Sequence, residues 1–213
     1  MPRIALIHAL AHSPAPINEA LARSWPQAQR MNLLDDSLSA DLAASGGVAD
    51  AAMHQRFQDL AAYAVGCGAQ AILFTCSAFG SCIDAVAKRL APMPVLKPNE
   101  AMVAEAERAG GRIGLLASFA PTLQSMPNEF SPATALDCEL AADAMDALNR
   151  GDTDMHDRAV VAAALRLRQR GVDRIALAQF SLARAAGAVR EATGLPVLTT
   201  VDSAVAELRA RLG

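Results

Sequence analysis

Aromatic residues and clustered positive charges are both scarce in this sequence. Phe, Trp and Tyr make up 4% of the 213 residues, and the formal net charge is −3. No run of Lys and Arg forms the basic stripe that binds a phosphate backbone, and few rings are available to stack on bases. We therefore expect no nucleic-acid partner.

Cysteine is scarce as well. The four cysteines, Cys67, Cys76, Cys82 and Cys138, lack the paired spacing of a zinc site or of a secreted disulfide framework. We expect no bound metal and a reducing, cytoplasmic location. The first residues, MPRI, lead directly into a predicted strand, so we expect no signal peptide.

The sequence also lacks a dinucleotide-binding loop and a membrane-spanning segment. Gly46-Gly47 and Gly110-Gly111 do not follow a predicted strand with the spacing of a dinucleotide-binding loop. Residues 60–83 contain no charge and are numerous enough to cross a bilayer. Glycines and polar residues break that stretch into a helix end, a turn, a strand and a loop, so we expect no membrane span.

Predicted strands and helices alternate along the chain, as in α/β domains whose parallel strands are joined by right-handed helical crossovers. A loop rich in Pro and Ser is expected at 9–16, and residues 118–125 are expected to begin as a loop and to turn into a helix. Strands are expected at 3–8, 30–34, 71–74, 94–96, 112–117, 134–138, 174–178 and 196–198, and helices at 17–23, 48–65, 83–90, 98–109, 139–170 with a break near 151, 182–192 and 203–212.

The two halves of the chain resemble each other. Residues 3–7 match 112–116, residues 68–72 match 171–175, and residues 94–96 recur as 196–198. The repeat predicts two pseudo-symmetric lobes, each with a mostly parallel sheet flanked by helices, and an active site in the cleft between them. We expect the first lobe at 1–97 plus 200–213 and the second at 98–199.

Cys76 lies where the apolar strand 71–74 ends and a helix is predicted to begin. Ligands bind at such strand ends in open α/β sheets, and a helix N-terminus favours anions and lowers a thiol pKa. The alternative is that Cys76 is a small buried apolar residue. In the register of the repeat, Gln179 occupies the corresponding position of the second half.

The sequence resembles the aspartate/glutamate/hydantoin racemase superfamily over nearly its whole length. The resemblance is carried by residues 74–78 (FTCSA), 113–116 (IGLL) with 121–125 (PTLQS), and 196–198 (PVL). It implies a cofactor-independent enzyme, often a homodimer or a larger oligomer. In such enzymes two cysteines, one per lobe, move a proton at the carbon next to the carboxylate of a small substrate.

The family roles carry over in part. Cys76 matches the first cysteine, and Thr122 matches a threonine that binds the substrate carboxylate. Ser77 and Ala78 stand where the family often has Asn and Thr, so some donors are missing. His8 falls where glutamate racemases carry an Asp that assists the first cysteine. It is expected either to take the thiol proton from Cys76 or to be a core or loop histidine with a satisfied ring.

The main departure is in the second half, where Gln179 stands in place of the second cysteine. Gln cannot act as a base, although it can donate a hydrogen bond. Ser118, Thr122, Gln179 and Ser77 are expected to hold the substrate carboxylate. The expected substrate-binding residues also include Ala78, Phe180 and Ser181. The remaining cysteines are expected to pack or to be structural. His12, His54 and His156 are expected at the surface or in loops, and Asp35 and Asp36 are expected to form a turn.

Three functions follow from these residues. The first is a one-thiol enzyme in which Cys76 transfers a proton next to the carboxylate of a small carboxylic or amino acid, as an isomerase or a decarboxylase. The second is a racemase in which Ser181 or His8 supplies the acid on the other face. The third is a non-catalytic small-molecule binding protein derived from a racemase.

Overall fold

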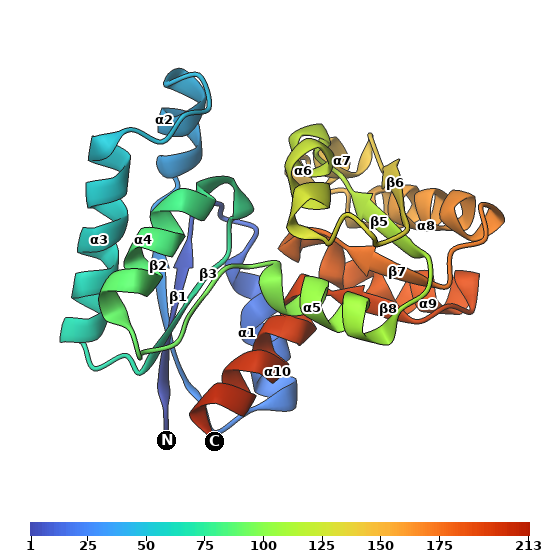
Figure 1. The fold of residues 1–213 in the computed structure, drawn as a ribbon. Helices are drawn as coiled ribbons and strands as arrows, with labels where there is room; N and C mark the ends of the chain where they lie inside the picture. The colour runs from blue at the N-terminus through green and yellow to red at the C-terminus, as the bar shows by residue number, and fades with distance from the viewer. The chain divides into compact units, whose positions relative to one another are not determined.

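The computed structural model describes residues 1–213, which form two compact units: Met1–Pro98 together with Ala204–Gly213, and Asn99–Ser203. Each unit contains a four-stranded parallel sheet flanked by helices (Figure 1). The predicted α/β class and the two similar lobes are confirmed.

The first unit contains four strands, which alternate with helices. In chain order the elements are β1 (Arg3–His8), α1 (Pro14–Ser24), β2 (Gln29–Leu34), α2 (Leu38–Ala44), α3 (Ala51–Gly66), β3 (Ala71–Phe74), the 3₁₀ turn η1 (Ser77–Phe79), α4 (Gly80–Leu90) and β4 (Val95–Leu96).

The second unit repeats this alternation. Its elements are α5 (Glu100–Ala109), β5 (Ile113–Ala117), α6 (Ala120–Ser125), η2 (Met126–Glu129), β6 (Leu136–Leu140), α7 (Ala144–Asn149), α8 (Thr153–Gln169), β7 (Arg174–Leu177), η3 (Phe180–Ala185), α9 (Ala186–Thr193) and β8 (Val197–Thr199). Helix α10 (Thr200–Leu212) begins in this unit and continues into the first.

The strand order is the same in both sheets. The first sheet runs β2-β1-β3-β4 and the second β6-β5-β7-β8, with every pair parallel. Ile4 pairs with Ala71 in the first sheet, and Ile113 pairs with Arg174 in the second. The sequence repeat is therefore a structural repeat, and β3 and β7 are corresponding strands.

The central strands of the first unit are buried on both faces, which explains their continuous apolar runs. Ile7 and Phe74 belong to one core cluster with buried residues of α2, α3 and α4. In that cluster the Phe57 ring stacks on Phe74 with a centroid distance of 5.2 Å and lies 4.9 Å from the ring of Phe79. This aromatic cluster anchors the turn that follows β3.

Several predictions about local structure are wrong. Helix α2 was not predicted, and it forms because Leu38 and Leu42 are buried in the core of the first unit. Glu139 and Leu140 belong to strand β6 rather than to a helix, because they pair with the neighbouring strand β5. Helix α1 begins at Pro14, inside the expected loop, because proline suits a first helical turn.

One side chain also differs in burial from its expected position. His156 is fully buried in α8, on the helix face that carries Val160, because its position faces the core of the second unit. Cys138, by contrast, lies within the strand β6, at an exposed position on the edge of the sheet.

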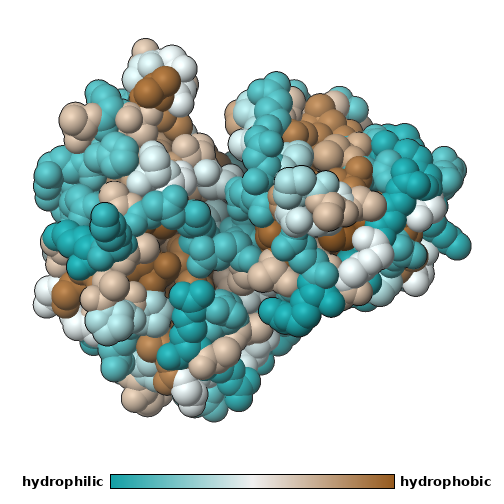
Figure 2. Space-filling view, in the orientation of Figure 1, coloured by the Kyte–Doolittle hydropathy of each residue, from teal (hydrophilic) through white to brown (hydrophobic).

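Exposed large apolar side chains occur singly along both units. Figure 2 shows hydrophobic residues interspersed with hydrophilic ones on one face of the molecule, as is normal for folded domains. None of the helices combines the length and apolar character that a membrane crossing requires.

Candidate functional site

Cys76 lies two residues beyond the end of β3. The Thr75 N–H donates to the Ile7 carbonyl at 3.0 Å, which extends the pairing of β1 and β3 past Phe74. Cys76 keeps an extended backbone, with φ −126° and ψ 121°, and then caps η1. Because side chains alternate along an extended chain, the Cys76 thiol lies on the same face as Phe74.

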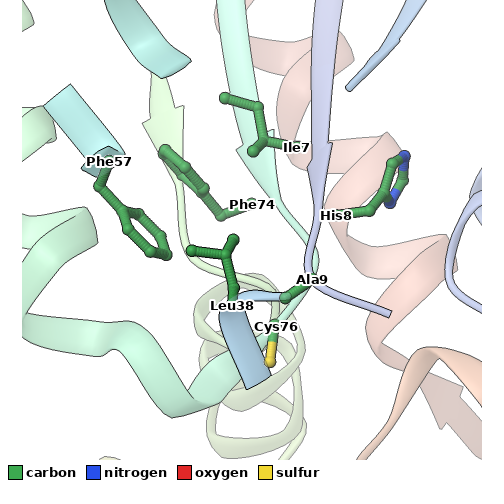
Figure 3. Close-up of a pocket in the computed structure, with 7 residues that line it drawn as sticks. All are labelled: Ile7, His8, Ala9, Leu38, Phe57, Phe74 and Cys76. Atoms are coloured by element: carbon green, nitrogen blue, oxygen red, sulfur yellow. The ribbon is translucent and has the colours of Figure 1, made fainter. Parts of the chain in front are cut away.

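The surroundings of the Cys76 thiol are almost entirely apolar. It lines a narrow pocket in the first unit with Ile7, Ala9, Leu38, Phe57 and Phe74 on the same side (Figure 3). The pocket has no room for a water-sized sphere. Burial raises the pKa of the Cys76 thiol, and the Ala78 N–H opposes this only in part. The expected lowering of the pKa by a helix N-terminus is absent, because η1 is a single short turn and desolvation outweighs it.

His8 points to the opposite face of the sheet from Cys76 (Figure 3). Its Nδ1 lies 2.9 Å from Thr75 Oγ1, and its Nε2 lies 3.0 Å from Asn32 Oδ1. The Asn32 oxygen can only accept, so Nε2 carries the proton and Nδ1 accepts from the Thr75 hydroxyl. Burial lowers the pKa of His8. The ring is therefore neutral, fully buried and satisfied at both nitrogens.

This histidine ties together three strand ends and the first helix. Asn18 on α1 donates to Asn32 Oδ1 at 2.9 Å and to the Pro14 carbonyl at 2.7 Å. The network thus runs from α1 through β2 to His8 on β1 and Thr75 after β3. No sequence pattern marks Thr75, Asn32 or Asn18 as partners of His8, because their contacts depend on the pairing of distant strands.

Other polar candidates of the first unit have less to offer a ligand. Ser77 is half-buried in η1, and Ala78, which has no polar side chain, is exposed. Asp35 forms an ion pair with Arg56 at 2.7 Å and accepts from Ser37 Oγ at 2.7 Å. These contacts hold the pKa of Asp35 below its usual value. Asp35 therefore fastens the turn after β2 to α3.

Gln179 has the position in the second unit that Cys76 has in the first. It follows β7 by two residues, has an extended backbone with φ −144° and ψ 148°, and caps η3. Its Oε1 accepts from the Ser118 backbone N–H at 2.6 Å and from Ser118 Oγ at 3.0 Å. Ser118 is buried directly after β5, the strand that pairs with β7.

The other predicted residues of the second unit lie on the elements that follow the same strands. Thr122 is buried on α6, and its N–H donates to the Phe119 carbonyl at 3.0 Å. Phe180 is buried, and Ser181 is half-buried, both on η3. Ser118, Thr122 and Gln179 therefore belong to neighbouring segments at the carboxyl edge of the second sheet.

The remaining candidates are the possible metal ligands and the cysteines. No group of three or more His, Cys, Asp or Glu side chains is arranged to hold a metal ion. All four cysteines are free. Cys82 is fully buried in the core of the first unit, as expected of a packing residue, and Cys67 caps the end of α3.

Solved structures of three racemases share this fold. The aspartate racemase of Picrophilus torridus is 11% identical with a TM-score of 0.77, over 99% of this chain and 94% of its own. The glutamate racemase of Francisella tularensis, in complex with D-glutamate, is 13% identical with a TM-score of 0.71, over 99% and 81%. The allantoin racemase of Klebsiella pneumoniae is 16% identical with a TM-score of 0.72, over 100% and 88%.

Sequence comparison gives the family directly. A search of curated protein sequences finds no significant match. The model of the Asp/Glu/Hydantoin racemase family matches residues 15–208, which include the strand end at Cys76 and its counterpart at Gln179. The chain therefore belongs to the Asp/Glu/Hydantoin racemase family.

Proposed function

We propose that this protein is a racemase-type enzyme that moves the proton on the carbon next to the carboxylate of a small carboxylic or amino acid. Cys76 is the single thiol acid/base, and no cofactor takes part. The observation that carries the proposal is the placement of Cys76 just beyond the carboxyl end of β3, since ligands of open α/β sheets bind at the carboxyl ends of the strands. The solved relative bound to D-glutamate supports a small amino acid as the substrate class.

The chemistry balances with one thiol. The Cys76 thiolate removes the proton from the α-carbon, the electron pair of the C–H bond passes into the carboxylate, and an enediolate forms opposite a neutral thiol. The thiol then returns a proton to the same carbon. In D₂O the returned hydron is deuterium whenever the thiol exchanges with solvent before it reprotonates the enediolate.

Racemisation also requires a second acid, which protonates the enediolate from the opposite face of the substrate. Gln179 cannot supply it, because an amide does not ionise in this range. His8 is not suited to it either, because both of its nitrogens are bonded within the first unit. We therefore propose α-proton exchange with retention of configuration as the basic activity. The family and the three racemase structures do not support a decarboxylase.

The test is deuterium incorporation from D₂O into each enantiomer of a panel of small amino acids and 2-substituted carboxylic acids. Mass spectrometry counts the exchange, and chiral chromatography measures inversion. We expect one enantiomer of a substrate to gain deuterium without inversion, and Cys76→Ser to abolish the gain. Cys138→Ser is the matched control, because that thiol is exposed on the edge strand β6 of the second sheet.

The result also separates the enzyme from the alternative function. If thermal shift detects a bound carboxylic acid but no substrate gains deuterium, the protein is a binding protein derived from a racemase. Full turnover in Cys76→Ser would exclude the proposed mechanism.

We further propose a cytoplasmic location. We also propose a homodimer or larger oligomer, and size-exclusion chromatography with light scattering would measure this oligomeric state.

A further inference from the structure

The side chain of Gln179 is held in one orientation by Ser118. A backbone N–H can only donate, so the Gln179 atom that lies 2.6 Å from the Ser118 nitrogen must be the carbonyl oxygen. The Ser118 hydroxyl donates to the same oxygen at 3.0 Å. Two donors therefore fix which end of the amide faces inward.

The other end of the amide carries two N–H donors and has no protein partner. Gln179 Nε2 takes part in no hydrogen bond within the protein, and it is not among the buried polar atoms that lack one. It is therefore open to solvent. The second unit thus presents an oriented amide at the position where the first unit presents the Cys76 thiol.

We propose that Ser118 and Gln179 form a subsite that binds a hydrogen-bond acceptor of the substrate, with the carboxylate as the preferred group. Ser118 is the positioning residue, and Gln179 Nε2 is the group that touches the ligand. Both side chains are uncharged, so the subsite tolerates a neutral carbonyl but favours a carboxylate, because hydrogen bonds to an ionised acceptor are about twice as strong.

This inference deepens the proposed function and rests on it for the identity of the reaction. It assigns Ser118 a role different from the expected one. The Ser118 N–H and hydroxyl are both used by Gln179, so Ser118 acts on the carboxylate through Gln179 rather than directly.

The experiment titrates sodium propanoate into ¹⁵N-labelled Cys76→Ser protein and follows the side-chain NH₂ signals of Gln179 by NMR. Gln179→Glu assigns these signals by their loss. Propanoate is expected to shift them in a saturable manner, propanamide to shift them with weaker binding, and methylammonium chloride to leave them in place. Signals that do not move with propanoate would overturn the proposal.

Variants separate positioning from folding. Ser118→Ala removes one of the two bonds to Gln179 and is expected to weaken propanoate binding roughly 3- to 10-fold, whereas Ser118→Thr keeps the hydroxyl and restores it. Gln179→Glu keeps both bonds from Ser118 but turns a negative oxygen outward, and is expected to abolish propanoate binding. Unchanged binding in Ser118→Ala would refute the positioning role.

The failure of this inference is distinguishable from that of the proposed function. The NMR titration uses protein without the Cys76 thiol, so it needs no turnover. A shift of the Gln179 signals without deuterium exchange in the native protein would leave the subsite standing and remove the enzyme. If the native protein exchanges deuterium, Ser118→Ala is expected to raise KM by the same factor, and an unchanged KM would overturn the subsite alone.

Discussion

The protonation state of Cys76 gives the sharpest test of the site. An ordinary thiol with a pKa of about 8.5 is about 3% thiolate at pH 7. Burial raises the pKa of Cys76, and each further unit lowers the thiolate fraction tenfold. We therefore expect the rate of Cys76 alkylation by iodoacetamide to rise about tenfold per pH unit between pH 7 and 9, without a plateau.

The apolar pocket supplies a perturbation of this pKa. Leu38 lines the pocket beside Cys76, whereas Leu42 lies on the same helix, α2, and packs in the same core without lining the pocket. Leu38→Ala removes apolar atoms from the thiol's surroundings and admits water, so we expect a lower pKa and faster alkylation, about tenfold for each unit. Leu42→Ala is the matched control.

Peptide mass spectrometry reads the modification of each cysteine in one sample, with Cys138 as the exposed reference. Unfolding in urea verifies that both variants stay folded, since truncating a buried leucine costs about 2–5 kcal/mol. A wild-type plateau below pH 8 would refute the reasoning, because it would reveal a thiolate already formed in the free protein. Equal rates in the two variants would refute the role of the pocket.

Three further predictions concern the second unit, the histidine network and the core. Gln179→Cys restores a thiol at the position corresponding to Cys76, and we expect chiral chromatography to detect inversion where the native protein shows only exchange. His8→Leu removes the bonds to Thr75 and Asn32 and is expected to lower the free energy of unfolding in urea by about 1–3 kcal/mol at pH 8. Burial lowers the pKa of His8 in the folded protein, so the unfolded chain takes up the proton first as the pH falls below about 6.5, and the wild-type protein loses stability. The difference in free energy of unfolding between wild type and His8→Leu is therefore expected to shrink at acid pH. A difference that grows in acid would contradict this. Gly114→Ala places a Cβ 3.0–3.2 Å from leucine and valine methyl groups and is expected to cost about 1–3 kcal/mol, whereas unchanged stability would show that these methyl groups move aside.

The sequence by itself determined the class of fold, the repeat and the position of Cys76. Continuous apolar runs bounded by glycine and proline are typical of buried parallel strands, and this pattern can be recognised in the local sequence alone. The strands β1, β3, β5 and β7 accordingly lie within a residue of their predicted bounds. The correspondence of Cys76 with Gln179 follows from the spacing of the repeat alone.

Only the tertiary structure decided what surrounds these residues. His8 is the last residue of β1, and Cys76 follows the neighbouring strand β3. The two side chains lie on opposite faces of the sheet, so His8 bonds to Thr75, 67 residues away, instead of to the thiol. Ser118 orients Gln179 across 61 residues. Such contacts depend on strand register, and helix α2 likewise forms because the core of the first unit buries its leucines. Neither the side-chain contacts nor helix α2 can be predicted from local propensity, because both depend on pairing and burial among segments that are distant in the chain.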